Sequence, residues 1–449
     1  MRTRLSRLPR LPRHPLAALA AAALLGLGLP GMATAQSLQE LYDAAVLYDA
    51  TYLGAKAQAA SAEFRAAQVE ALGRPTVSAT ASANTAQTDP PNVGLRASNS
   101  AQGALNARYP LFNRANKIAI EQARKSLETA QADLASAEQD LIIRVSQAYF
   151  DVLAAQDALA TTRASKSFIT EQLASAKRNF EVGTATITDT REAQARFDLG
   201  TAQEIAADND LRTKRIALDQ LVGRPGVAPK TLLVPVVLPA TAPANPEEWV
   251  TVADTQHPAV RRARVGLDVA QLETSKARAG DLPTVDAVGS IGSGYARGSA
   301  VLNSGTTTNA NLGLQMTWPL YTGGATQNRI KETLLLEERS RNDVEVARRG
   351  VAQATRVAYF GVQSGLAQVR ALEAAEVSSK LALEATQLGY RVGVRVNLDV
   401  LNSQAQLFST QRDLARARYD VLVGSLRLRQ ASGQLAAGDL QGINALLAK

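Results

Sequence analysis

The chain carries an internal repeat, and this repeat limits the possible folds more than any other feature of the sequence. Residues 148–223 align with residues 358–433 at a constant offset of 210, without a gap. Matching segments include Ala148-Tyr149-Phe150 with Ala358-Tyr359-Phe360, and Val182-Gly183 with Val392-Gly393. Each half therefore encodes one copy of the same supersecondary unit. The function must come from what two such units build together.

The first 35 residues have the features of a secretory signal peptide. Five arginines precede an apolar run from Leu16 to Leu29, and Ala33-Thr34-Ala35 forms a small-residue cleavage pattern. The run is too short for a membrane-spanning helix, so we expect the protein to be exported. Removal of this leader lowers the formal charge from +8 to +3, since 44 basic and 41 acidic residues are left. This small charge gives no reason to expect nucleic acid as a partner.

Residues that carry catalysis and metal binding are scarce. The chain has no cysteine, and His257 is the one histidine that follows the leader. Zinc sites, thiol nucleophiles and Ser-His-Asp triads depend on such residues. Dinucleotide-binding and P-loop motifs are also absent from the sequence that follows the leader. We therefore expect no enzyme activity, no cofactor and no metal site, and we interpret His257 as a polar residue near the start of a helix.

Each half predicts the same order of elements: a helix, two strands, a very long helix and a second long helix. The expected division is a signal peptide (1–35), a first repeat (36–223), a connector (224–244), a second repeat (245–433) and a C-terminal segment (434–449). The long helical hairpins are expected over 114–223 and 325–433, where small and apolar residues recur every seven residues as in coiled coils. At about 1.5 Å per residue, the first long helix spans roughly 100 Å.

Alternating apolar and polar residues predict four β-strands, over 76–88, 103–112, 284–296 and 309–321. Their length suits tilted strands that cross a bilayer, with one apolar and one polar face. Four aromatic residues cluster at one end of the strands, as in the aromatic girdle at a membrane interface. These residues are Tyr109, Phe112, Trp318 and Tyr321. A soluble hairpin packed on a core shows the same alternation, so the pattern alone leaves that alternative open.

Four strands cannot close a barrel by themselves. An open sheet edge is not tolerated in lipid, and the smallest bacterial barrels have eight strands. Strands placed in the outer membrane therefore require an oligomer, in which two chains give eight strands and three chains give twelve. Helices longer than the membrane is thick must project into the periplasm. The expected assembly is an outer-membrane barrel continued by a tube of helices.

Several motifs accompany the repeat in a specific order. They are Arg74-Pro75-Thr76, Leu282-Pro283-Thr284, Tyr109-Pro110-Leu111-Phe112, Trp318-Pro319-Leu320-Tyr321-Thr322-Gly323-Gly324, and the turns at residues 178–189 and 389–401. Through them the chain resembles the TolC family of outer-membrane efflux and secretion ducts, over essentially the whole sequence after the leader. The resemblance implies a mostly α-helical homotrimer with a twelve-stranded barrel in outer-membrane lipid and a long periplasmic α-helical barrel.

The resemblance also implies a function and partners. The function would be a passive exit duct of a tripartite efflux pump or a type I secretion system. The partners would be a periplasmic adaptor of the membrane fusion type and an inner-membrane pump of the ABC, RND or MFS type. Docking of the adaptor would open the periplasmic end of the duct.

The two Val-Gly turns are the candidate site. On physical grounds alone, a glycine after a helix allows a left-handed cap, which leaves open the alternative that these turns only shape the helical hairpins. The resemblance assigns adaptor docking to Val182, Gly183, Thr184, Val392, Gly393 and Val394. It assigns links that close the entrance to Asp189, Tyr390 and Arg395. It places Asp399 in a ring around the pore, and Asn402 at the position of a second ring, where the family has aspartate. We therefore expect a single anionic ring, with weaker cation selectivity and weaker metal block.

Two other classes of function compete with a duct. A structural coiled-coil protein of the periplasm, for example an adaptor, would have long helices but would not need alternating strands that end in aromatic residues. An enzyme has almost no support, because acidic and basic residues are scattered along solvated helical faces.

Overall fold

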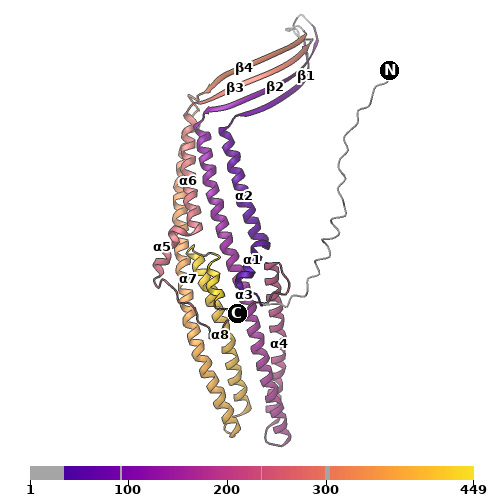
Figure 1. The fold of residues 1–449 in the computed structure, drawn as a ribbon, viewed down its shortest axis with the longest axis vertical. Helices are drawn as coiled ribbons and strands as arrows, with labels where there is room; N and C mark the ends of the chain where they lie inside the picture. The colour runs from indigo at the N-terminus through magenta and orange to yellow at the C-terminus, as the bar shows by residue number, and fades with distance from the viewer. Residues whose placement is uncertain (1–34, 90, 92–93, 234, 299–303, 449) are drawn as a thin grey trace, which may run out of the picture.

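The computed structural model describes residues 35–89, 91, 94–233, 235–298 and 304–448. The expected signal peptide (1–35) therefore lies outside the described residues, except for Ala35. The chain is elongated, with a β-sheet at one end and the tips of two helical hairpins at the other (Figure 1).

Two long helical hairpins form most of the molecule. The first consists of α3 (Arg114–Glu181) and α4 (Ile187–Val222), and the second of α7 (Ala325–Arg391) and α8 (Asn397–Ala431). Helices α3 and α8 also pack against each other, which joins the two repeats into one body. Among the described residues, none of the helices is both long and apolar enough to cross a membrane.

The helix expected before each strand pair is in fact two helices. Their bounds are α1 (Leu38–Tyr48), α2 (Ala50–Glu70), α5 (Pro246–Gln256) and α6 (Pro258–Arg278). Asp49 has an extended backbone between α1 and α2, and its side chain caps α2 by accepting from the Tyr52 N–H at 2.7 Å. His257 separates α5 from α6, because a residue before proline is driven out of the helical region. Its Nδ1 accepts from the Ala259 N–H at 3.1 Å, so His257 caps a helix start.

The four strands form one antiparallel sheet in the order β1-β2-β3-β4. Their bounds are β1 (Thr76–Thr88), β2 (Arg96–Phe112), β3 (Thr284–Arg297) and β4 (Gly305–Thr317). The register aligns one polar residue from each strand in a single row, namely Ser78, Asn106, Ser290 and Asn311. The adjacent row is apolar and contains Ala79, Leu105, Ile291 and Ala310. Because neighbouring rows point to opposite faces, the sheet has one polar and one apolar face.

Two strands differ by several residues from the ranges that the sequence predicts, and β3 ends one residue later than predicted. β2 begins at Arg96 instead of residue 103, because its polar outer half pairs with the outer half of β1. β4 covers Gly305–Thr317 instead of 309–321. Its pairing ends at Thr317, opposite the first residue of β3, and Pro319 has no N–H with which to continue the ladder. Trp318 and Tyr321 therefore follow the strand instead of belonging to it.

The largest apolar core lies midway along the helices. In it, the Phe150 ring of α3 stacks on the Tyr419 ring of α8, with centroids 5.6 Å apart. The Tyr419 hydroxyl donates to Asp157 Oδ2 at 2.6 Å. Burial raises the pKa of the Asp157 carboxyl above its usual value. The core thus bonds the two hairpins to each other well away from their tips.

The segment that joins the repeats wraps around this core. Gln36 forms a bridge with Pro229, and Leu232 forms a bridge with Leu447 after the short helix α9 (Asp439–Asn444). The fully buried Tyr149 of α3 donates its hydroxyl proton toward the Lys230 carbonyl at 2.9 Å. The connector and the C-terminal segment therefore lie side by side at the middle of the molecule.

Candidate functional site

The two hairpin tips have the same backbone geometry. Gly183 and Gly393 both have φ of +79°, which is a conformation that residues with a side chain rarely adopt. The Gly183 N–H donates to the Phe180 carbonyl at 3.0 Å, and the Gly393 N–H donates to the Tyr390 carbonyl at 3.1 Å. Each glycine thus ends a long helix and reverses the chain, as the sequence repeat requires.

The valines at these tips project into solvent. Val182 is 72% exposed, Val392 is 65% exposed and Val394 is 78% exposed. Thr184 at the first tip donates its hydroxyl proton to the Asn179 carbonyl at 3.1 Å, so the first tip has a polar residue where the second has Val394. Both tips offer exposed apolar contact points at the far end of the chain from the sheet (Figure 1).

Equivalent aspartates follow the two tips but have different partners. Asp189 Oδ2 accepts from the Thr186 hydroxyl at 2.8 Å and from the Thr186 N–H at 3.0 Å, which forms a capping box. Val396 occupies the place of Thr186 in the second repeat and has no hydroxyl to offer. Asp399 instead faces Arg395, with 3.6 Å between Oδ2 and Nη1. The T-x-x-D spacing of Thr186 and Asp189 is a sequence signal for this capping box.

The residues expected to link the entrance are not bonded to one another within the chain. Asp189 is occupied by Thr186, and Arg395 by Asp399. The Tyr390 hydroxyl accepts from Asn179 Nδ2 at 3.3 Å, which joins the tip of α7 to the tip of α3. The expected bonds from Tyr390 and Arg395 to Asp189 are therefore absent among the described residues of one chain, because each group has a nearer partner.

The two expected ring residues lie one turn apart on α8. Asp399 has a side chain 37% exposed, and Asn402 is exposed. Arg196 of α4 donates from Nη2 to Asn402 Oδ1 at 2.9 Å. Sequence analysis did not single out Arg196. The sequence distinguishes Arg196 in one way only. The equivalent position of the second repeat, 210 residues later, is the neutral Gln406, so Arg196 is a charge that the second repeat lacks.

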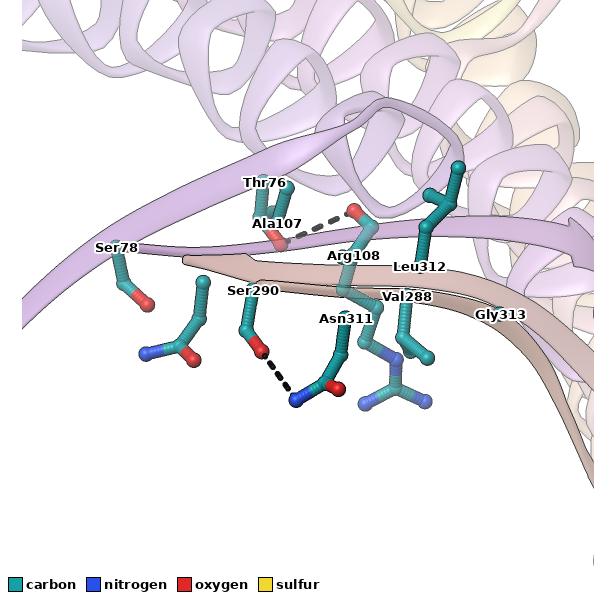
Figure 2. A pocket seen from close by; sticks show the side chains of 11 residues that line it. Thr76, Ser78, Ala107, Arg108, Val288, Ser290, Asn311, Leu312 and Gly313 are labelled. Atoms are coloured by element: carbon teal, nitrogen blue, oxygen red, sulfur yellow. Dashed lines mark hydrogen bonds between the residues drawn. The ribbon is translucent and has the colours of Figure 1, made fainter. Parts of the chain in front are cut away.

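The polar face of the sheet forms a second candidate surface. Figure 2 shows Ser78, Ser290, Asn311 and Arg108 projecting to one side of the sheet, while Leu312 projects to the other. These residues surround a shallow hollow of about 580 Å³. Asn311 Nδ2 donates to Ser290 Oγ at 3.5 Å across the β3–β4 pair. The polar face of the sheet thus carries small hydroxyl and amide side chains, which suit contact with water.

One ion pair joins two neighbouring strands on this polar face. Arg108 Nη2 lies 2.6 Å from Asp286 Oδ2, and the Asp286 side chain is only 7% exposed. The pair joins β2 of the first repeat to β3 of the second. The alternation of the sequence places Arg108 on the polar face, but it does not indicate a partner 178 residues away.

The four aromatic residues lie at the end of the sheet nearest the helices. Tyr109 and Phe112 belong to β2, whereas Trp318 and Tyr321 follow β4. Each of the four is more than 40% exposed, and Tyr321 is 89% exposed. Trp318 Nε1 donates to the Asp281 carbonyl at 3.1 Å, which fixes the indole at the turn before β3. The part of the chain that the structure describes contains no group of three or more His, Asp or Glu side chains placed to hold a metal ion.

Comparisons with known proteins give a consistent result. The sequence profile of the family described as "Outer membrane efflux protein" matches residues 42–224 and 249–434. "Outer membrane protein TolC" of Vibrio cholerae serotype O1 is 32% identical over 417 residues, covering 92% of this chain and 94% of the relative. "Alkaline protease secretion protein AprF" of Pseudomonas aeruginosa is 34% identical over 346 residues, covering 75% of this chain and 70% of the relative.

Solved structures agree on the fold. The outer membrane protein VceC of Vibrio cholerae superposes with a TM-score of 0.75 at 19% identity, over 88% of this chain and 96% of VceC. The open state of the MtrE outer membrane channel of Neisseria gonorrhoeae superposes with a TM-score of 0.71 at 22% identity, over 89% of this chain and 90% of MtrE. The two family matches in one chain coincide with the two structural repeats.

Proposed function

The chain belongs to the outer membrane efflux protein family, as an exit duct of the outer membrane, and we propose that it works as the passive duct of a tripartite efflux pump or a type I secretion system. The sheet lies in the outer membrane and the helical hairpins extend into the periplasm. In this proposal cargo passes through the duct without catalysis and without a cofactor.

The observation that carries the proposal is the position of two like hairpin tips at the opposite end from a sheet with an exposed apolar face. Leu312 is 92% exposed and Leu314 is 73% exposed on that face. Side chains of this kind are stable when they face lipid. The same arrangement places Val182 and Val392 as far from the membrane as the chain reaches, where a periplasmic protein can contact them.

We propose that three chains assemble around the duct. Within the described residues, β1 pairs only with β2, and β4 pairs only with β3. Both outer strands therefore present unpaired backbone groups, which lipid does not tolerate. Pairing of β4 with β1 of the next chain satisfies these groups, and three chains give a closed barrel of twelve strands with the polar face inside.

The hairpin tips form the entrance in this assembly. We propose that Val182, Gly183 and Thr184, together with Val392, Gly393 and Val394, receive a periplasmic adaptor of the membrane fusion type. The adaptor connects the duct to an inner-membrane pump of the ABC, RND or MFS type. Links between Asp189, Tyr390 and Arg395 of neighbouring chains hold the entrance closed, and the positions of Asp399 and Asn402 face the pore.

Membrane fractionation tests this proposal directly. The full chain should be recovered in the outer membrane as an oligomer that dissociates only on heating, and it should form channels in a planar lipid bilayer. Cross-linking from a cysteine placed at Val394 should capture an adaptor, while a cysteine at the exposed Val346 of α7, far from the tip, should not. Recovery as a periplasmic monomer without channel activity would favour a structural coiled-coil protein instead.

A further inference from the structure

We infer that Arg196 determines the charge preference of the entrance, and that it makes the entrance favour anionic over cationic cargo. The inference deepens the proposed function and depends on it, because it needs the hairpin tips to surround the pore. It concerns four residues near the tips, namely Arg196, Arg395, Asp399 and Asn402.

Asp399 and Asn402 share one face of α8. They are three residues apart, which places their side chains on the same side of a helix. The intervening Val400 and Leu401 are buried, at 1% and 4% exposure, against the rest of the bundle. Any pore surface formed by Asp399 therefore includes Asn402 and the group bonded to it, which is the Arg196 guanidinium.

The charge of Asp399 is balanced locally. The Arg395 guanidinium lies 3.6 Å from its carboxylate. Asp399 also lies in the first turn of α8, where the partial positive charge of the helix start compensates a carboxylate. A pore lined by Asp399 alone would attract cations, but this carboxylate already has two sources of positive charge beside it.

The charge of Arg196 is not balanced in this way. Its bonding partner, Asn402, is a neutral amide. Among the described residues, Arg196 takes part in no ion pair with a carboxylate, whereas Arg395 pairs with Asp399. A guanidinium stays protonated at every physiological pH, so each chain adds one lasting positive charge at this level.

The charge count around the second tip points the same way. Residues 388–406 contain Arg391, Arg395 and a single acidic residue, Asp399. Residues 178–196 of the first tip contain three arginines, Arg196 among them, and three acidic residues, so their formal charges cancel. Each chain therefore brings the Arg196 guanidinium and a second tip with a net charge of +1 to the same narrow passage. Rings of arginine or lysine select anions, so the cargo class that this entrance favours carries carboxylate, sulfonate or phosphate groups. The anionic ring expected at Asp399 is accordingly offset by cations on both sides.

Ion selectivity of the purified full-length oligomer in a planar bilayer tests the inference. Under a potassium chloride gradient, the reversal potential gives the permeability ratio of chloride to potassium. Arg196→Gln removes the charge and should lower this ratio by about threefold. Arg212→Gln removes an arginine from the same helix that is paired with Asp208 and lies far from the tip, and it should leave the ratio unchanged.

A second variant guards against a folding defect in the first. Asn402→Asp places a carboxylate on the Arg196 guanidinium without removing any bond, and it should shift the ratio in the same direction. Channels that prefer potassium and keep the same ratio in Arg196→Gln and Asn402→Asp would overturn the inference while leaving the duct intact. A correctly assembled outer-membrane oligomer that forms no channels would instead overturn the proposed function, and the inference with it.

Discussion

The guanidinium of Arg144 binds both carboxylate oxygens of Asp49, at 2.7 Å and 2.8 Å. Asp49 separates α1 from α2, and its side chain is only 9% exposed. The pair therefore fixes the break between these helices to the middle of α3. A planar guanidinium that meets a carboxylate in this way forms a strong, directional contact.

Asp49→Asn should destabilise the assembly at neutral pH but not in acid. The hydrogen bonds from Arg144 lower the pKa of the Asp49 carboxyl below its usual value. The pair therefore adds stability above the unfolded pKa of about 3.9, and this stability is lost as the pH falls through the folded pKa. We expect Asp49→Asn to cost about 1–2 kcal/mol at pH 7, since asparagine keeps the cap on α2 but loses the charge. Heat dissociation of the oligomer across pH 3–7 measures this, and Asp43→Asn, at an exposed site of α1, is the control.

Removal of Arg108 alone should destabilise the oligomer more than removal of Arg108 and Asp286 together. Arg108→Gln leaves a buried carboxylate without a cation, whereas the double variant with Asp286→Asn leaves two neutral groups. We expect the single Arg108 variant to lose about 1–3 kcal/mol and the double variant to regain most of it. Midpoints of heat dissociation for all four forms give the coupling. Equal losses in the single and the double variant would contradict a role for the pair in joining the repeats.

The tip glycines should tolerate asparagine better than alanine. A Cβ added at Gly183 or Gly393 meets open space among the described residues, so the cost of substitution is conformational only. The left-handed backbone costs alanine about 1 kcal/mol, and asparagine less. We expect Gly393→Ala to weaken cross-linking to the adaptor and to lower the heat-dissociation midpoint of the oligomer slightly, and Gly393→Asn to keep most of both. Equal cross-linking in both variants would show that docking does not depend on the backbone conformation of the turn.

Gly223 and Gly433, the last residues of the two repeats, should differ in how much a substitution by alanine destabilises the oligomer. A Cβ on Gly223 would lie 2.3 Å from the Tyr48 ring, which is an exposed side chain that can rotate away. A Cβ on Gly433 would lie 2.5 Å from the His257 Cα, which is backbone and cannot. We expect Gly433→Ala to cost roughly 2 kcal/mol more than Gly223→Ala, as measured by heat dissociation.

Loss of an entrance link should open the duct. Arg395→Ser removes the group that pairs with Asp399 in the single chain and that we propose links chains in the closed trimer. Tyr390→Phe removes the hydroxyl that bonds Asn179 across the tips. Either change should raise the single-channel conductance in a planar bilayer. Unchanged conductance in both variants would rule out these residues as the closing contacts.

The parts of the fold that sequence predicts well are those with local signals. The hairpin turns carry a Val-Gly pair within the turn itself, and the seams of the long helices repeat every seven residues. The structure places the second long helix of each hairpin within a few residues of each tip glycine. Such elements are fixed by neighbours in sequence, so a pattern in one segment is enough to find them.

The features that were missed depend on distant partners. The outer half of β2 has few apolar residues, and it is a strand because β1 and β3 lie on either side. Arg196 gains its place from Asn402 of the other repeat, and Arg108 from Asp286. No period or spacing within one segment carries that information.

The pairing of β2 with β3 has a consequence for the order of events during biogenesis. These strands are neighbours in the sheet, yet the whole first hairpin and the connector lie between them in the chain. The entropy of closing so long a loop makes this contact slow to form compared with the local hairpins. The apolar face of the sheet is thus completed only after the second half of the chain has arrived. A chain built this way completes the surface that faces lipid later than it forms its local hairpins.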